Sequence, residues 1–259
     1  MTHTFYKYHG TGNDFILIDN RQNLVDKNDT KIVKFLCDRR FGIGADGLIL
    51  LEDHKTLDFK MVYFNSDGNE STMCGNGGRC LVAFAQRLNI INSEATFEAI
   101  DGVHHATIDN ELIHLQMQDV NEIKKYDNHI VLNTGSPHHV QLENNVKELD
   151  IKTKGSEIRY GKTYEAEGVN VNFVEKINDD VFAVRTYERG VEDETLSCGT
   201  GVTAVALAMK YIGETEKNLI TLKTPGGDLQ VSFKRQNGKF SNVLLIGPAK
   251  FVYKGSIEW

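Results

Sequence analysis

The sequence has few prolines, no long apolar run and no dense cluster of basic residues. Three prolines among 259 residues, with no low-complexity stretch, argue against a long disordered linker. No run of about 18 apolar residues occurs, and the first seven residues contain no apolar signal core. The sequence therefore predicts neither a membrane-spanning helix nor a secretion signal, and we expect a cytoplasmic protein.

The charge balance excludes some classes of partner. The net charge is −7, from 36 acidic and 29 basic side chains, and the basic residues are not gathered in one segment. A nucleic-acid or anionic-membrane partner is therefore not expected. A small anionic substrate would need local rather than global attraction. The length suits one large domain or two of ordinary size.

The sequence contains four cysteines, at Cys37, Cys74, Cys80 and Cys198. In a reducing compartment we expect reduced thiols rather than disulfides. The spacing of Cys74 and Cys80 matches no common zinc pattern. The adjacent histidine pairs at 104–105 and 138–139 would point to opposite faces of a strand, so neither pair would chelate one ion. No metal site is predicted, and Cys37 and Cys80 are most simply packing residues on helices.

One glycine-rich segment, Gly42-Ile43-Gly44-Ala45-Asp46-Gly47, satisfies the dinucleotide-binding pattern G-x-G-x-x-G. That pattern binds a pyrophosphate only when a strand precedes it and a helix follows. Here a predicted helix over 32–39 precedes the segment and a predicted strand over 48–51 follows it. The order is reversed, so a dinucleotide cofactor is not expected.

The chain repeats itself once. Two cysteines have similar surroundings, in Cys74-Gly75-Asn76-Gly77 and Cys198-Gly199-Thr200-Gly201. Each follows a strand-like run and an acidic, turn-rich loop, and each precedes an apolar helical stretch, at 80–85 and 202–209. Turn glycines before and after each cysteine stand in nearly equal register, which favours a duplication over coincidence.

The duplication predicts an α+β fold of two pseudo-symmetric repeats. Each repeat would be a mixed or antiparallel, barrel-like sheet wrapped around a central buried helix, because helices that are apolar on most sides are usually buried. We expect an N-terminal repeat over 1–118, joined by a C-terminal strand within 249–259, and a C-terminal repeat over 119–248. The boundary is expected between Met117 and His129, where 121–125 is interpreted as a polar crossing between the halves.

A cysteine at the start of a helix has a chemical interpretation. The positive end of the helix dipole lowers the pKa of a thiol and favours the thiolate, which can accept a proton. Neighbouring glycines let a ligand approach the backbone and leave helix N–H groups for a carboxylate. Taken alone, such a cysteine is more often a packing residue. Two of them, Cys74 and Cys198, on opposite sides of one interdomain cleft could invert a carbon stereocentre without a metal or coenzyme.

The longest of these motifs, from Asn65 to Arg79 around Cys74, resembles the signature of the diaminopimelate epimerase family. It departs from that signature at Asn69, where the family usually has Ser. Further landmarks of the family stand in order at 9–15, 42–47, 135–138, 168–172, 187–190, 197–201 and 247–249. The resemblance covers essentially the whole chain.

The resemblance implies a cofactor-independent isomerase that converts LL-2,6-diaminoheptanedioate to its meso form, for lysine and peptidoglycan precursor biosynthesis. It implies that Cys74 and Cys198 are the acid–base pair and that His138 and Glu188 are important for catalysis. It implies a homodimer with Tyr253 at the contact. The substrate-binding positions that it implies are Asn13, Asn65, Gly75, Asn76, Ser136, Asn170, Glu188, Arg189, Gly199 and Thr200. Ser136 and Gly47 depart from members that have Asn and Gln there.

Two other interpretations remain open from the sequence. One is a relative with the same duplicated fold, such as a proline racemase or an isomerase resembling the phenazine-biosynthesis proteins. Asn76 and the segment 187–190 favour the diaminopimelate member. The other is a binding protein without catalysis, against which the presence of both cysteines argues. Which sulfur serves which stereoisomer is left open.

Overall fold

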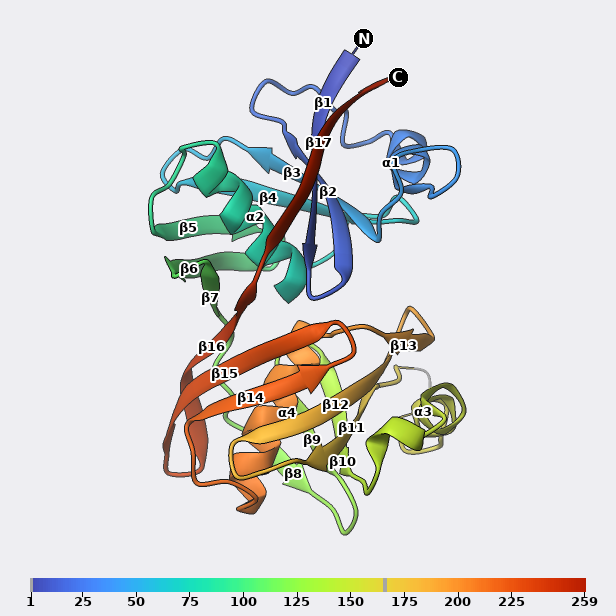
Figure 1. Ribbon diagram of the computed structural model, residues 1–259, viewed down its shortest axis with the longest axis vertical. Helices are drawn as coiled ribbons and strands as arrows, with labels where there is room; N and C mark the ends of the chain where they lie inside the picture. The colour runs from blue at the N-terminus through green and yellow to red at the C-terminus, as the bar shows by residue number, and fades with distance from the viewer. Residues whose placement is uncertain (1, 165–166) are drawn as a thin grey trace. The chain divides into compact units, whose positions relative to one another are not determined.

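The structure is a computed structural model that describes residues 2–164 and 167–259 (Figure 1). These residues form two compact units. The first unit contains the chain up to Leu115 together with Gly247–Trp259, and the second is Gln116–Ile246. The division into domains over 1–118 with 249–259 and over 119–248 stays a prediction. Within the described ranges, no helix is both long and apolar enough to cross a membrane.

The first unit is a mixed sheet with two helices. Its elements are β1 (Thr2–Gly10), β2 (Asn13–Asp19), α1 (Thr30–Cys37), β3 (Gly47–Glu52), β4 (Phe59–Asn65), α2 (Gly75–Arg87), β5 (Glu94–Ala99), β6 (Gly102–Asp109), β7 (Leu112–Gln116) and β17 (Lys250–Glu258). Along the chain, β1 and β2 pair antiparallel, β2 and β3 parallel, and β3 and β4 antiparallel. The pairing continues parallel from β4 to β5 and antiparallel through β6 to β7. The C-terminal strand β17 pairs antiparallel with β1.

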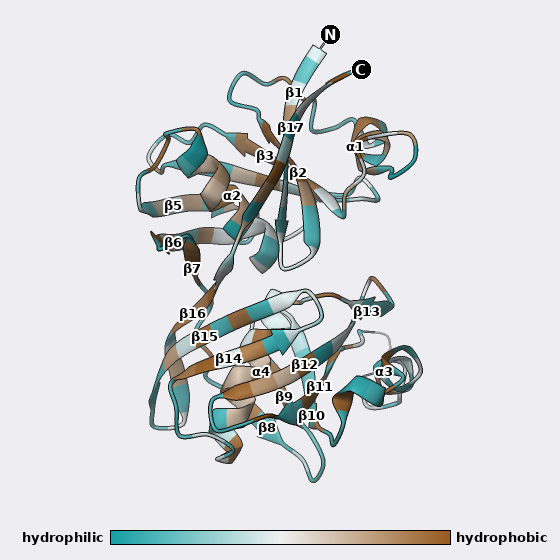
Figure 2. Ribbon diagram, in the orientation of Figure 1, coloured by the Kyte–Doolittle hydropathy of each residue, from teal (hydrophilic) through white to brown (hydrophobic). Residues whose placement is uncertain are grey.

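The second unit has a similar set of elements. They are β8 (Ile123–Lys125), β9 (Ile130–Asn133), β10 (Pro137–Leu142), the short helix η1 (Val146–Glu148), α3 (Ile151–Arg159), β11 (Asn170–Lys176), β12 (Val181–Glu188), β13 (Asp193–Thr195), α4 (Gly199–Ile212), β14 (Leu219–Thr224), β15 (Gly227–Gln236) and β16 (Lys239–Pro248). Hydrophobic and polar residues alternate along β15, as Figure 2 shows, and its alternate side chains are buried.

The two units pair their strands in the same order, which confirms the duplication. In the second unit β9 and β10 pair antiparallel, β10 and β11 parallel, and β11 and β12 antiparallel. Then β12 pairs parallel with β14, and antiparallel pairs follow through β15 to β16. In each unit a helix also connects the two strands of each parallel pair. These helices are α1 and α2 in the first unit and α3 and α4 in the second. The α+β class and its pseudo-symmetric repeats are therefore confirmed.

Each unit packs its sheet around one buried helix. In the first unit α2 contacts β1, β2, β3 and β6, and in the second α4 contacts β9, β10, β11, β14 and β15. Every residue of α4 from Gly201 to Lys210 is buried, so this helix has no solvent-facing side along that stretch. It ends at Gly213, whose left-handed backbone (φ 85°) suits a glycine after a helix.

The residues that cap the N-termini of the helices are of two types, aspartate and cysteine. The N-cap residues of α1 and α3 are Asp29 and Asp150, whose carboxylates accept hydrogen bonds from first-turn N–H groups. The N-cap residues of α2 and α4 are instead Cys74 and Cys198, and neither thiol makes a capping hydrogen bond. Cysteine is not among the residue types that favour this position for stability. The expected placement of both cysteines at helix starts is confirmed.

One expectation about the chain path was wrong. The segment 121–125 was interpreted as a polar crossing between the halves, but Ile123–Lys125 is strand β8. It pairs antiparallel with β9 inside the second unit, with Ile123 opposite Leu132. The polar residues of this segment lie on an exposed strand, where an outward-facing side chain needs no apolar character. The change of unit falls earlier, between Leu115 and Gln116.

Candidate active site

In the first unit, Cys74 lies in a group of polar side chains. It is half-buried, and its Sγ lies 3.7 Å from the side-chain oxygen of Asn13, at the start of β2. The side-chain nitrogen of Asn76, in the first turn of α2, donates to the same oxygen at 3.3 Å. The predicted residues Asn13, Cys74 and Asn76 are therefore brought together, with Gly75 beside them at the first position of the helix.

A buried arginine orients this group. The guanidinium of Arg79 is fully buried and donates to the side-chain oxygen of Asn76 at 3.0 Å and to the carbonyl of Gly75 at 3.2 Å. Burial lowers the pKa of Arg79. Because a guanidinium only donates, the amide oxygen of Asn76 must face Arg79. The amide nitrogen of Asn76 is therefore directed toward Asn13.

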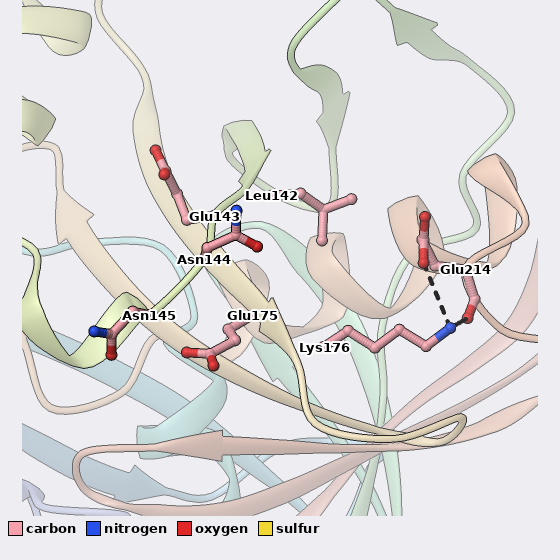
Figure 3. A pocket seen from close by; sticks show the side chains of 7 residues that line it. All are labelled: Leu142, Glu143, Asn144, Asn145, Glu175, Lys176 and Glu214. Carbon is pink, nitrogen blue, oxygen red and sulfur yellow. Dashed lines mark hydrogen bonds and ion pairs between the residues drawn. The ribbon is translucent and has the colours of Figure 1, made fainter.

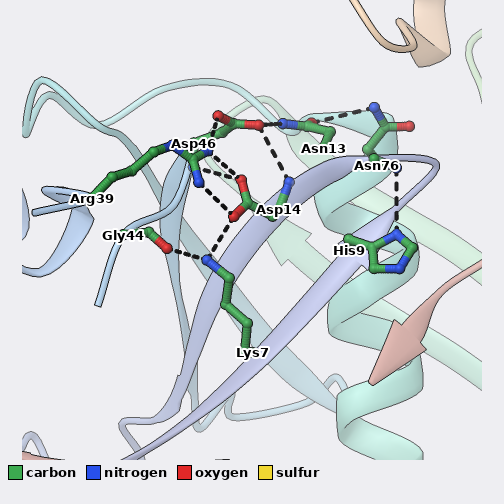
Figure 4. A network of polar contacts seen from close by, with 9 residues as sticks. Lys7, His9, Asn13, Asp14, Arg39, Gly44, Asp46 and Asn76 are labelled. Carbon is green, nitrogen blue, oxygen red and sulfur yellow. Dashed lines mark hydrogen bonds and ion pairs between the residues drawn. The ribbon is translucent and has the colours of Figure 1, made fainter. Parts of the chain in front are cut away.

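The side-chain nitrogen of Asn13 faces a network of charged residues (Figure 4). The side-chain nitrogen of Asn13 donates to Asp46 at 2.6 Å. Arg39 bridges Asp46, at 2.8 Å, and Asp14, at 2.7 Å. Lys7, which is buried, pairs with Asp14 and donates to the carbonyl of Gly44. Because a carboxylate accepts only, Asp46 keeps the amide oxygen of Asn13 turned toward Cys74.

In the second unit, Cys198 belongs to a chain of polar contacts. Its Sγ lies 3.4 Å from the hydroxyl of Thr200, and that hydroxyl lies 3.0 Å from Nε2 of His138. His138 is fully buried on β10, and burial, with a further contribution from the positive charge of Arg189, lowers its pKa to about 3. The predicted residues Cys198, Thr200 and His138 are therefore brought together, and His138 is neutral at physiological pH.

The remaining predicted residues of this unit lie at neighbouring strand ends. Asn170 begins β11 directly opposite His138 in the parallel pair of β10 and β11. Its side-chain oxygen accepts from the backbone N–H of Arg189 at 2.9 Å, and Glu188 is the last residue of β12. Ser136 is half-buried just before β10. Gly199 is the first residue of α4, so it lies between Cys198 and Thr200.

Two further predicted residues are placed by the strands of the first unit. Asn65 is exposed at the end of β4, opposite Gly47 at the start of β3. A Cβ on Gly47 would lie 2.6 Å from the carbonyl oxygen of Phe64, so the backbone leaves no room for a side chain there. Tyr253 lies on β17 and is 43% exposed, with Phe251 and Val252 exposed beside it.

Two of the four cysteines are packing residues. Cys37 and Cys80 are buried, and burial raises the pKa of each thiol to about 12. The segment 42–47 follows α1 and precedes β3, so the expected order of helix before strand is confirmed. Over residues 2–164 and 167–259, no group of three or more His, Cys, Asp or Glu side chains is arranged to hold a metal ion.

A surface depression of about 440 Å³ lies elsewhere in the second unit (Figure 3). It is lined by Leu142, Glu143, Asn144, Asn145, Glu175, Lys176 and Glu214. Lys176 donates to the backbone carbonyl of Glu214 at 2.6 Å, and Glu175 accepts from the backbone N–H of Val146 at 2.8 Å. These charged groups hold loops together, and none of the predicted site residues lines the depression.

Two solved structures of other proteins share this fold. The chain superposes with a TM-score of 0.81 on a PhzF-family phenazine biosynthesis protein of Bacillus anthracis, at 13% identity over 100% of both chains. It superposes with a TM-score of 0.69 on a probable proline racemase of Agrobacterium radiobacter, at 14% identity over 98% of this chain and 92% of the other. At such identities the likeness defines the fold alone: a duplicated sheet with a central helix.

Sequence comparison is more specific. The family model described as diaminopimelate epimerase matches residues 5–122 and 130–252. A diaminopimelate epimerase of Flavobacterium psychrophilum is 60% identical over 97% of this chain and 99% of its own. One from Chlorobaculum tepidum is 43% identical over 96% and 98%. The chain belongs to the diaminopimelate epimerase family.

Sequence reasoning assigned no role to three residues that the structure places beside the predicted ones. Arg79 was noted only as the end of a motif, Asp46 as part of the glycine-rich segment, and Asn172 as part of 168–172. Asn172 is fully buried and contacts His138. The sequence could have indicated a role for Arg79, because a charged residue in a helix that is apolar on most sides needs buried polar partners.

Proposed function

We propose that this chain converts LL-2,6-diaminoheptanedioate to its meso form, with Cys74 and Cys198 as the acid–base pair. Membership of the diaminopimelate epimerase family makes it an isomerase and a PLP-independent amino-acid epimerase of lysine and peptidoglycan precursor biosynthesis. The observation that supports the two-cysteine mechanism is that one of these cysteines is the N-cap residue of the central helix in each repeat.

The reaction needs one thiolate and one thiol. The thiolate removes the proton from the α-carbon, and the thiol then delivers its own proton to the opposite face of that carbon. The sulfur–hydrogen bond formed on one cysteine balances the one broken on the other, so the enzyme returns with the two roles exchanged. The positive end of a helix stabilises the thiolate at each position. No coenzyme takes part in this scheme.

The polar residues around each cysteine suit an amino-acid substrate. The N-termini of α2 and α4, at Gly75 and Gly199, offer backbone N–H groups to a carboxylate. Arg189 can hold a carboxylate as a bidentate pair, and Glu188 can accept from an ammonium group. The amides of Asn13, Asn65 and Asn170 supply neutral donors and acceptors for the end that does not react. Asn76, Ser136 and Thr200 are the other proposed substrate contacts.

The setting of the enzyme is a further part of the proposal. We expect it to act in the cytoplasm on a small-molecule substrate, with neither nucleic acid nor membrane as a partner. We also expect a homodimer in which Tyr253 lies at the contact, since an aromatic residue with a polar tip suits an interface. The exposed apolar side chains around it on β17 support this. Light scattering of Tyr253→Ala should show a lower mass, and an unchanged mass would contradict the assignment.

The decisive experiment follows the α-proton. The enzyme is incubated with LL-diaminopimelate in deuterium oxide, and exchange and epimerisation are followed by proton NMR. Cys74→Ser and Cys198→Ser should each lose epimerisation by roughly two or more orders of magnitude, on the scale of a lost general acid or base. Each single variant can still exchange the α-proton of one stereoisomer, because one base remains. Near-normal turnover by either variant would overturn the mechanism.

Two controls belong to the same experiment. Cys37→Ser and Cys80→Ser remove buried thiols that the proposed reaction does not use, so both should keep near-normal turnover apart from a packing cost. Proline offered as the substrate tests the proline racemase alternative. Turnover of proline in place of diaminopimelate would contradict the proposed substrate, and binding without any proton exchange would favour a non-catalytic protein.

A further inference from the structure

We infer that Asn172 is a positioning residue: it fixes the buried His138 as the tautomer with its proton on Nε2, which leaves the hydroxyl of Thr200 to donate to Cys198. The tautomer follows from contacts inside the second unit alone. Its consequence for catalysis rests on the function proposed above. Asn172 lies on β11, two residues after the predicted substrate contact Asn170.

The orientation of the Asn172 side chain is determined by its partners. Its nitrogen lies 3.0 Å from the backbone carbonyl of His139, and a carbonyl can only accept. The group that faces His139 must therefore be the amide nitrogen. The amide oxygen faces the hydroxyl of Thr186, which donates to it at 3.0 Å. Asn172 and Thr186 are both buried, so both ends of the amide are held away from solvent.

This orientation dictates where the proton of His138 lies. The same nitrogen of Asn172 lies 3.1 Å from Nδ1 of His138. An amide nitrogen can only donate, so Nδ1 must be the acceptor and carries no proton. His138 is neutral, since burial lowers its pKa to about 3. A neutral imidazole has one N–H group, and it is therefore at Nε2.

The hydroxyl of Thr200 receives the next hydrogen bond. Nε2–H of His138 donates to the hydroxyl oxygen of Thr200 at 3.0 Å. The hydroxyl of Thr200 has one proton of its own. That proton cannot point at Nε2 of His138, because Nε2–H already donates to the hydroxyl oxygen. Cys198 Sγ lies 3.4 Å from the same oxygen. The hydroxyl is thus left to donate to the sulfur, and a donor at that distance stabilises the thiolate of Cys198.

The charge near His138 favours the same neutral ring. The charged group that acts on His138 is Arg189, whose positive charge further disfavours protonation of the ring. The opposite face of the strand holds a second buried histidine, His139, whose pKa burial lowers to about 4. Its Nδ1 contacts Tyr164 at 2.8 Å and its Nε2 contacts Gln141 at 3.2 Å. His139 is therefore also buried and neutral, but its side chain makes a separate set of contacts.

The tautomer can be read directly by NMR. In protein labelled with ¹⁵N at histidine, correlation of the ring nitrogens with the carbon-bound protons distinguishes a protonated Nε2 from a protonated Nδ1. The signals of His138 are assigned by their loss in His138→Gln. We expect the wild-type enzyme to show a neutral ring with the proton on Nε2. A proton on Nδ1, or an even mixture of the two tautomers, would overturn the inference without any variant of Asn172.

Asn172→Asp changes the tautomer while keeping the shape of the side chain. A carboxylate accepts rather than donates, so it should draw the proton of His138 to Nδ1. Nε2 then accepts from Thr200, and Cys198 loses its donor. We expect kcat to fall about 10- to 100-fold, the scale of one hydrogen bond to a charged group, with KM changed by less than about threefold. An unchanged tautomer with unchanged kcat would overturn the inference.

The hydroxyl itself is tested by two substitutions at Thr200. Thr200→Ser keeps the hydroxyl and should keep most of kcat, whereas Thr200→Val keeps the shape without the hydroxyl and should lose as much as Asn172→Asp. Equal activity of the two would contradict the donor role. His139→Gln and Thr203→Val are the matched controls. Thr203 donates to the carbonyl of Gly199 at 2.9 Å in the same helix, so neither control should alter the spectrum of His138 or kcat beyond about twofold.

The two hypotheses can fail separately. If Cys198→Ser retained normal epimerisation, the proposed mechanism would fall, while the protonated Nε2 of His138 would still be observed. If both cysteines proved essential but His138 carried its proton on Nδ1, only the role of Asn172 would fall.

Discussion

The carboxylate of Asp14 lies 2.7 Å from the ammonium group of Lys7, whose side chain is only 9% exposed. Burial alone would raise the pKa of Asp14, but hydrogen bonds and charges from Arg39 and Lys7 lower it to about 2. The folded-state pKa is therefore below the ordinary value of 3.8. The stabilisation that this implies is fully present above about pH 4 and is lost as the pH falls through about 2.

Asp14→Asn should destabilise the protein because it leaves the buried ammonium of Lys7 without its carboxylate. We expect a loss of about 2 kcal/mol in the free energy of unfolding at pH 7, from a shift of this size. The difference from wild type should shrink toward pH 2. Urea unfolding at several pH values measures it. Asp19→Asn, which removes the carboxylate from a more exposed pair with Arg21, is the control and should cost less than about 1 kcal/mol.

The four cysteines should differ sharply in reactivity. The pKa values of about 12 for Cys37 and Cys80 leave almost no thiolate at pH 8. Iodoacetamide should therefore label Cys74 and Cys198 in the folded protein well before the other two. Mass spectrometry of the digested protein gives the rate at each site. Diaminopimelate should protect Cys74 and Cys198, and rapid labelling of Cys80 in folded protein would contradict the assignment.

Gly201 is expected to be intolerant of a side chain. A Cβ there would lie 2.5 Å from the side-chain oxygen of Asn172 and 3.3 Å from Sγ of Cys198. Gly201→Ala should displace both groups, with a stability cost of about 1 to 3 kcal/mol and a loss of kcat. Gly213→Ala is a control, because it has open space around it but a left-handed backbone. It should cost about 1 kcal/mol through strain and leave kcat unchanged.

Position 47, where some members of the family have Gln, should not tolerate a Gln side chain in this protein. A Cβ at this position would lie 2.6 Å from a ring carbon of Tyr63 as well as 2.6 Å from the carbonyl of Phe64. Gly47→Gln should lower the midpoint of thermal unfolding by several degrees, on the scale of about 1 to 3 kcal/mol for overpacking. Differential scanning calorimetry checks this. An unchanged midpoint would show that β3 and β4 can separate at little cost.

The parts of the fold that depend on periodic patterns could be predicted from the sequence. The two helix starts at cysteine and the apolar stretches that follow them identified α2 and α4, because a buried helix leaves a continuous apolar signal. The repeat identified the architecture. Strand β8 was missed because an exposed three-residue strand carries no such signal, and its polar composition is equally typical of a loop.

The sequence predicted which residues form the candidate site, but it did not predict how their side chains are oriented. Motifs that resemble a family name Asn13, Cys74 and His138. They do not say that Asp46 turns the amide of Asn13 or that Asn172 fixes the ring of His138. Those roles arise from pairs far apart in the chain, such as 13 with 46 and 138 with 172. Only the paired strands bring them within hydrogen-bond distance.

The identical strand order of the two units has a consequence for the history of the reaction. Under the proposed two-cysteine mechanism, a single ancestral repeat would have supplied one sulfur, so an inversion would have required two copies of it, each with the same surroundings. Fusion into one chain allowed those surroundings to diverge. Cys74 now lies beside the amide oxygen of Asn13, an acceptor, and Cys198 beside the hydroxyl of Thr200, a donor. Under that mechanism, a symmetric pair of repeats would treat both faces of a stereocentre alike, whereas a chain with two different repeats would treat each face differently.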